Sequence, residues 1–109
     1  MDPKVISLLA GNFLLSSTIL LLEKIDYKEI TEIKKKVEKL TNEKIPDNEF
    51  LKIIHELMEN NLIDIKGVEI DLGTSITLSL LGKEASNLIK NSYFNAYSIN
   101  EDRLREIAK

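Results

Sequence analysis

The chain of 109 residues carries a formal net charge of −3, with 43% hydrophobic and 30% charged residues, which is ordinary for a single globular domain spanning 1–109. The lack of cysteine excludes disulfides, thiolate metal sites and cysteine nucleophiles, and the single histidine, His55, excludes a metal site built from several histidines. Heavy use of lysine, glutamate, isoleucine and asparagine indicates a heat-adapted source, a thermophile.

The first segment is strongly apolar. Val5 to Leu22 contains no charged residue, and its 18 residues reach the length of a membrane span. A span is disfavoured because the segment is interrupted by residues that suit a bilayer poorly, and because it lacks the small-residue cleavage site of a signal peptide. The interrupting residues are Ser7, Gly11, Asn12, Ser16, Ser17 and Thr18. We therefore expect two buried helical pieces in a cytoplasmic protein, with a membrane or export role as the alternative.

The ends of these two pieces follow from capping residues. Asp2 can cap the first helix, with Pro3 at its first position, and Gly11-Asn12 bends or breaks it. Ser16 or Ser17 is expected to cap the second, which runs to about Lys24. The apolar surface of this first helix must be buried, and a second copy of the chain is the simplest partner that would bury it.

The segment YKEITEIKKKVEKL predicts an amphipathic helix, because Ile30, Ile33, Val37 and Leu40 fall on one narrow apolar side. Lys28, Lys35 and Lys39 lie close together on the opposite side at helical spacing. These lysines form either a solvated surface balanced by neighbouring glutamates or a stripe that contacts phosphates.

The segment DNEFLKIIHELMENN predicts the next helix, with Asp47 as its cap and Asn60-Asn61 as its end. Its apolar side faces the core, and its polar side carries more acid than base. The apolar side comprises Phe50, Leu51, Ile53, Ile54, Leu57 and Met58, and the polar side Asn48, Glu49, Lys52, His55, Glu56 and Glu59.

A β-hairpin is expected next. LIDIK alternates like a half-buried strand, KGVEIDLGTS forms the tip, and SITLSLL returns with β-branched residues. A helix continues from there through Ala85, Leu88 and Ile89, and its apolar side includes Tyr93, Phe94 and Tyr97. The capping-box pattern Ser98-Ile99-Asn100-Glu101 predicts a final short helix that holds Leu104 and Ile107.

This order of elements resembles the winged helix-turn-helix family of MarR-like and PadR-like transcriptional regulators over residues 16–90. Asn61-Leu62-Ile63 is similar to the Gly-Leu-Ile that ends their recognition helix, and Ile76–Lys83 to the Tyr-x-Leu-Thr-x-x-Gly-Lys that closes their wing, with Ser79 in place of the capping threonine. The resemblance implies a mainly α fold with a small β-hairpin, an α+β class. It also implies that an N-terminal helix in 1–15 and the C-terminal helices in 83–109 build a homodimer. The aromatics of the last segment, expected to be exposed, and the apolar first helix would suit that contact; packing onto the domain's own core is the alternative.

Charge leaves two functions open. Between Glu43 and Gly82 there are three lysines and eight acidic residues, a net charge of −5, whereas duplex binding draws affinity from neutralised phosphates. The chain is expected to be either a dimeric DNA-binding transcription regulator or a protein–protein module whose acidic face docks on a basic partner. For double-stranded DNA, Asn48, Lys52 and His55 would contact bases, and the phosphate contacts would be Lys28, Lys35, Lys39 and Lys66.

An enzyme is the least supported class. The four glycines are scattered and form no phosphate loop, and His55 with Glu56 and Glu59 makes no catalytic triad. His55 and Glu59 are four residues apart and are expected to form a surface pair rather than a metal site. No catalytic residue, cofactor or metal is therefore expected.

Overall fold

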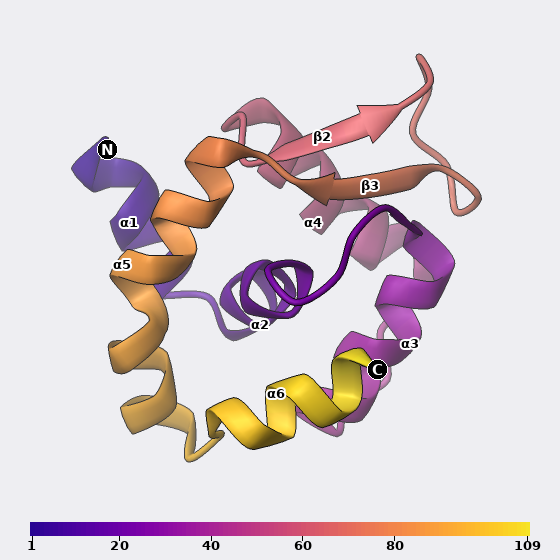
Figure 1. Cartoon of the computed structure of the whole chain (residues 1–109). Helices are drawn as coiled ribbons and strands as arrows, with labels where there is room; N and C mark the ends of the chain where they lie inside the picture. The colour runs from indigo at the N-terminus through magenta and orange to yellow at the C-terminus, as the bar shows by residue number, and fades with distance from the viewer.

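The computed structural model describes all of residues 1–109 as a mainly helical protein with a small three-stranded antiparallel sheet (Figure 1). This confirms the α+β class expected from the sequence. In chain order the elements are α1 (Pro3–Ala10), α2 (Phe13–Leu22), β1 (Lys28–Glu29), α3 (Ile30–Thr41), α4 (Asp47–Glu59), β2 (Ile63–Lys66), β3 (Ser75–Leu78), α5 (Leu80–Tyr97) and α6 (Glu101–Ala108).

Helix α2 lies at the centre of the molecule, and the other elements surround it (Figure 1). It contacts α1, α3, α4, α5, α6 and β3. Every residue from Leu15 to Leu22 is buried. A helix with no polar side is stable in water only when it is covered all round, and FLLSSTILLL is such a helix. Of the two buried helical pieces expected from the sequence, α2 is confirmed. The expectation is wrong for α1, where only Leu9 is buried, because this helix packs with one side on the body and leaves the other in solvent.

The start of α2 differs from the sequence prediction. Asn12 is the capping residue and accepts a hydrogen bond from Leu15 N at 3.0 Å, so Phe13–Leu15 belong to α2 rather than to the first helix. Ser16 lies inside the helix and donates to the Asn12 carbonyl at 2.8 Å. Neither Ser16 nor Ser17 caps the helix, because the chain reaches a cap directly after the break at Gly11.

The polar side chains buried in α2 all have partners. Ser17 Oγ lies 2.7 Å from the Tyr93 hydroxyl of α5, and Thr18 Oγ1 donates to the Leu14 carbonyl at 2.7 Å. Burial raises the pKa of Tyr93 despite the hydrogen bond with Ser17. These bonds explain how serine and threonine fit in an apolar core helix without a desolvation penalty.

No single helix is long and apolar enough to cross a membrane. Helices α1 and α2 satisfy that length and composition only as a pair, and they are bent by 104° at the break between them.

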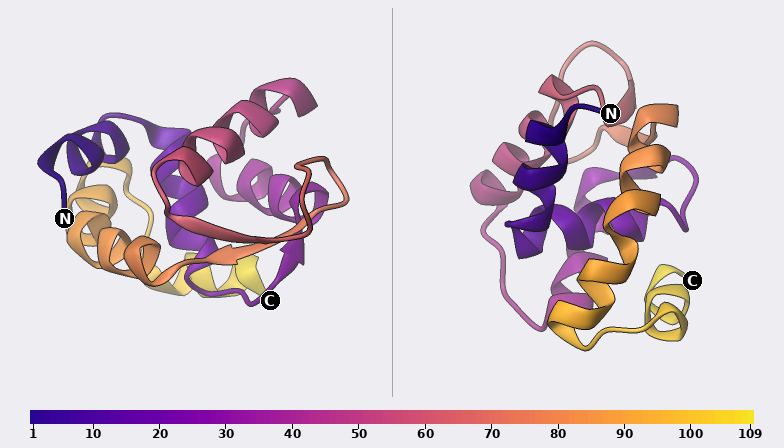
Figure 2. Two further views of the ribbon diagram at one scale, coloured as in Figure 1. Left: turned by 90° about the horizontal axis from the view of Figure 1, so that it is seen from above. Right: turned by 90° about the vertical axis from the view of Figure 1, so that its left-hand side faces the viewer.

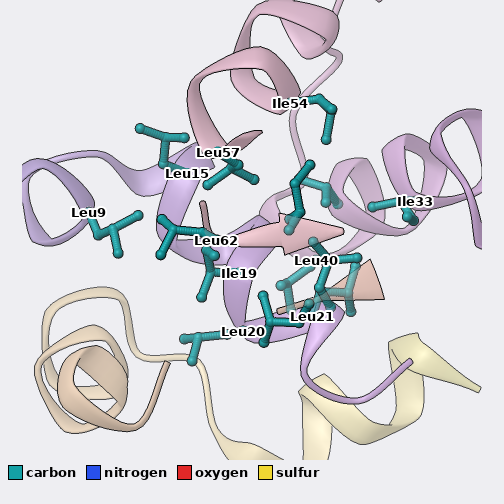
Figure 3. Close-up of a cluster of buried hydrophobic side chains, with 14 of the residues drawn as sticks. Leu9, Leu15, Ile19, Leu20, Leu21, Ile33, Leu40, Ile54, Leu57 and Leu62 are labelled. Atoms are coloured by element: carbon teal, nitrogen blue, oxygen red, sulfur yellow. The ribbon is translucent and has the colours of Figure 1, made fainter. Parts of the chain in front are cut away.

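The core is one cluster of buried side chains, mostly leucine and isoleucine, from nearly every element (Figure 3). Leu9 of α1 and Leu15 and Ile19 of α2 meet Leu57 and Leu62 around the end of α4, as Figure 3 shows. All four residues of the stripe expected on α3 are buried, namely Ile30, Ile33, Val37 and Leu40. The register predicted for α3 is therefore confirmed.

The sheet contains a strand that the sequence analysis does not predict. The strand order is β1-β3-β2, and Lys28 and Glu29 of β1 pair with Ile76 and Ser75 of β3. Two residues are too few to give a periodic pattern. As a consequence Lys28 is not on α3, and the expected stripe of Lys28, Lys35 and Lys39 on one helix is wrong.

The expectation that the aromatic side chains near the C-terminus are exposed is wrong, because Tyr93 is buried, Phe94 and Tyr97 are half-buried, and their rings pack within the chain. Tyr93 is 2% exposed. The centre of its ring lies 5.2 Å from the ring centre of Tyr97, and the ring centre of Tyr97 lies 4.3 Å from that of Phe13 of α2. Helix α6 is capped by Asn100, which accepts from Arg103 N at 2.8 Å, and not by Ser98, which has a left-handed backbone. Leu104 is buried as expected.

The hairpin is joined to α4 at one tightly packed junction. Asn61 has a φ of 60°, the left-handed conformation expected at the helix end, and its carbonyl accepts from Ser79 Oγ at 2.7 Å. Ser79 caps α5 as expected, accepting from Gly82 N at 3.0 Å. A Cβ at Gly82 would lie 2.6 Å from Leu78 Cδ1 and even closer to the Leu62 carbonyl oxygen. Only glycine therefore fits at this position of the Leu-Ser-Leu-Leu-Gly-Lys segment.

Two charged side chains directly after α2, Glu23 and Lys24, connect it to α5 and α6. Glu23 accepts hydrogen bonds from Ser86 Oγ and, at 2.9 Å, from Lys90 Nζ, both on α5. Lys24 Nζ lies 3.5 Å from Glu23 and forms an ion pair with Glu101 of α6. Burial alone would raise the pKa of Glu23, but these hydrogen bonds and the charges of Lys90 and Lys24 hold it below its ordinary value of 4.5.

Gly82→Ala should destabilise the protein even though alanine is the better helix former by about 1 kcal/mol. Because the added methyl group would overlap the Leu62 carbonyl and Leu78, we expect a loss of about 1–3 kcal/mol in the free energy of unfolding. The control is Gly73→Ala, whose Cβ would lie 3.5 Å from Asp71 Oδ1, an ordinary contact. Urea denaturation of both variants is the measurement, and equal stability of the two would contradict the packing at this junction.

Glu23→Gln should lower the free energy of unfolding at pH 7 by about 1–2 kcal/mol, allowing for partial solvent screening. The pKa of Glu23 is lower in the folded chain than in the unfolded chain. The contribution of Glu23 to the free energy of unfolding is therefore complete above the unfolded-state pKa, and it is lost as the pH falls through the folded-state pKa. The difference from wild type should therefore shrink in denaturation curves at about pH 3. Glu106→Gln, an exposed glutamate without an ion pair, is the control, and a Glu23→Gln effect independent of pH would contradict this account.

Candidate nucleic-acid interface

Helix α4 has one side in the core and one side in solvent. Phe50, Ile54 and Leu57 are fully buried. Asn48, Lys52 and His55, predicted to contact bases, are all exposed and lie on the outward side. Since none of the three takes part in a side-chain hydrogen bond or ion pair within the chain, all are available to a partner, as the sequence analysis requires. The expected pair of His55 with Glu59 does not form.

The start of α4 is held by α3. Lys34 Nζ donates to the Ile45 carbonyl at 3.2 Å and lies 3.1 Å from Asp47, and the Ile45 amide donates to Glu38 at 2.8 Å. The prediction of Asp47 as the cap is wrong, because Pro46 occupies that position and Asp47 is the first helical residue. Asp47 still helps to fix the helix, since a carboxylate in the first turn is favourable to the helix dipole and here also pairs with Lys34.

The hairpin loop projects from the body of the molecule (Figure 2). Thr74 organises it: its hydroxyl donates to the Glu69 carbonyl at 2.9 Å and accepts from the Asp71 amide at 3.0 Å. Val68 at the tip is 97% exposed, and the side chains of Glu69 and Asp71 are exposed beside it. The tip therefore presents an apolar group flanked by acid, in an ordered loop.

The predicted phosphate-contacting lysines fall into two groups. Lys28 and Lys66 come from the two outer strands of the sheet, and Lys66 Nζ lies 4.4 Å from the centre of the Tyr27 ring. Lys35 and Lys39 lie on α3 and line a cleft between α3 and α6. All four are exposed, but they do not form one continuous stripe.

The acidic excess lies on the surface. Seven of the eight acidic residues between Glu43 and Gly82 are exposed, and Glu56 is half-buried. This stretch contains α4, β2 and the hairpin loop, which include the only base-contact candidates. On α4 itself, exposed Asp47, Glu49 and Glu59 accompany Asn48, Lys52 and His55.

Two features relevant to the interface could not be predicted from the pattern of the sequence. Lys34 sets the start of α4 through contacts that cross the α3–α4 turn, and the cleft between α3 and α6 joins residues more than sixty positions apart. No group of three or more histidine, cysteine, aspartate or glutamate side chains is placed to hold a metal ion.

No family model matches this chain, and no curated protein and no solved structure matches it.

Proposed function

We propose that this chain is a winged-helix DNA-binding protein that acts as a dimeric transcription regulator in the cytoplasm. The observation that supports this most directly is the unpartnered outward side of α4, where Asn48, Lys52 and His55 stand together on a rigidly seated helix. A helix of this kind enters the major groove, where lysine reads guanine and asparagine reads adenine. The order of a helix, a short strand, two helices and an antiparallel hairpin agrees with the winged-helix resemblance.

Phosphate contacts on this proposal come from Lys28 and Lys66 at the sheet and from Lys35 and Lys39 on α3. All four are exposed, and none forms an ion pair within the chain. They would fix the register of the protein on the duplex without reading sequence.

A second candidate function is favoured by the acidic side of the molecule. Val68 projects at the hairpin tip next to Glu69, and the stretch from Glu43 to Gly82 has a net charge of −5. A protein partner with a basic surface and an apolar pocket would suit this surface, because complementary charge steers association and disfavours wrong partners.

Dimer formation is supported by apolar side chains on α5 that the chain leaves uncovered. Leu88 is 56% exposed and Leu81 37% exposed, and seven residues of spacing place them on the same side of the helix. Helix α1 packs beside α5. A second copy would cover these leucines.

Lys52→Ala should weaken binding to a preferred duplex by about 1–3 kcal/mol, whereas Lys35→Ala should weaken all sequences alike. The measurement is a gel-shift titration at low salt with genomic and random fragments. Lys4→Ala, an exposed lysine of α1, is the matched control and should leave both affinities unchanged. No retention of any fragment at micromolar protein under low salt would contradict DNA binding and favour the protein partner.

Glu69→Lys separates the two candidates by the sign of its effect. For DNA it should strengthen binding and steepen the salt dependence by about one phosphate contact, because a repelling charge becomes an attracting one. For a basic partner it should weaken binding, measured by anisotropy with a labelled lysine-rich peptide as the probe. Glu69 has no side-chain contact within the chain, so the substitution leaves the Thr74 bonds of the loop intact.

Leu88→Lys should convert a dimer to a monomer in sedimentation equilibrium, because it places a charge in an apolar contact. Val68→Lys, a similar change at the hairpin tip away from α5, should leave the mass unchanged. A wild-type chain that sediments as a clean monomer at high concentration would contradict the dimer.

A further inference from the structure

A cleft of about 1040 Å³ lies between α3 and α6 and extends to the turn that leads into α4. It is lined by six basic and four acidic side chains, a net +2, whereas the whole chain is −3. The basic residues are Lys35, Lys36, Lys39, Lys44, Arg103 and Lys109. The cleft is thus a positive hollow on a protein that is otherwise negative.

Two of these six basic side chains hold the two helices together. Lys36 of α3 donates to the carbonyls of Ile107 and Lys109 at 3.1 and 2.9 Å, at the end of α6. Arg103 of α6 donates to the carbonyls of Lys39 and Leu40 at 3.0 and 3.4 Å, at the end of α3. Each helix therefore supplies a cation to the C-terminal carbonyls of the other helix. These hydrogen bonds give Lys36 and Arg103 a structural role that needs no ligand.

The other four basic side chains of the cleft have no such structural role. Lys35, Lys39, Lys44 and Lys109 are exposed, and none lies within 4.0 Å of a carboxylate, since no ion pair includes them. Of the acids that line the cleft, Glu38 is engaged by Lys34 and by the Ile45 amide. Glu32, Glu43 and Glu106 also line the cleft and offset part of this charge, which leaves the net of +2. A bound anion relieves the repulsion among the remaining positive charges.

We infer that this cleft binds a ligand that carries several phosphates close together. Because the lysines come from α3, from the turn and from the end of α6 around one cleft of this volume, several linked phosphates suit the lining better than a single phosphate. A free triphosphate and the phosphodiester backbone of a nucleic acid share this chemistry. The site rests in part on the proposed function, which already assigns phosphate contacts to Lys35 and Lys39, and it goes beyond that function by adding Lys44 and Lys109 in one cleft.

The separation of the two sites follows from α3. Lys34 faces α4, and Lys36, two residues further along the chain, faces α6, so the two neighbours lie on roughly opposite sides of the helix. Both views in Figure 2 place α4 and α6 on opposite sides of the molecule. A ligand in the cleft therefore does not occupy the outward side of α4.

The test is calorimetric titration of the wild-type chain with inorganic triphosphate at low salt. Binding should be measurable and should weaken as salt is raised. Lys39→Glu combined with Lys44→Glu should reduce the affinity at least about tenfold. The matched control, Lys4→Glu combined with Lys83→Glu, makes the same change in net charge at exposed lysines in the first turns of α1 and α5, and should change the affinity less than about twofold.

Backbone amide shifts in the NMR spectrum of the wild-type chain provide a readout that needs no variant. Triphosphate should shift amides of α3, the turn at 42–46 and α6, and leave the outward residues of α4 unchanged. No heat at millimolar triphosphate, equal loss in both double variants, or shifts spread over the whole surface would each overturn the inference.

Competition distinguishes the two sources of phosphate. A labelled single-stranded oligonucleotide that triphosphate displaces, and that the Lys39→Glu and Lys44→Glu variant releases, identifies a nucleic-acid backbone as the occupant. An oligonucleotide that does not compete identifies a free polyphosphate. Neither result depends on the Lys52→Ala measurement. A failure of α4 to contact bases and a failure of the cleft to bind phosphate would therefore appear in different experiments.

Discussion

The structure depends on the need to cover α2 on every side. Eight consecutive buried residues, Leu15 to Leu22, leave most of this helix without contact with water, and six other elements pack on it. The bend of 104° after Gly11 follows from the same constraint, because it lets α1 turn away from the axis of α2 and pack against α5. The charged side chains of Glu23 and Lys24 then begin where the burial ends, and they attach α5 and α6 by ionic contacts.

Helix α3 transmits this constraint to the functional surface. Its apolar stripe is fixed on α2, so the rotation of the helix about its own axis is also fixed. Lys34 is thereby aimed at the start of α4 and Lys36 at the end of α6. One rigid helix thus sets the orientation of α4 on one side and forms a wall of the basic cleft on the other.

The sequence predicts the parts of this fold that rest on periodicity and local capping. The stripe of Ile30, Ile33, Val37 and Leu40, the inward side of α4 and the serine cap of α5 need only neighbouring residues, and the structure confirms them. Strand β1, the cap of α2 and the cleft could not be predicted in this way. A two-residue strand exists only because β3 lies beside it, and the cleft only because α6 returns to α3. The exposure of Lys52 and His55 was predictable from α4 alone, but the functional use of that surface depends on a partner.

The charge distribution carries information that the fold does not require. Core packing dictates the leucines and isoleucines, but Lys35, Lys39 and Lys44 on one side and Glu69 and Asp71 on the other are all exposed. The hairpin tip carries Glu69 and Asp71, whereas the cleft between α3 and α6 has a net +2. Because duplex DNA gains much of its affinity from phosphate neutralisation, α4 and its acidic surroundings provide little general attraction. Any binding through α4 must then depend on base contacts by a few side chains, which favours selective over non-specific association.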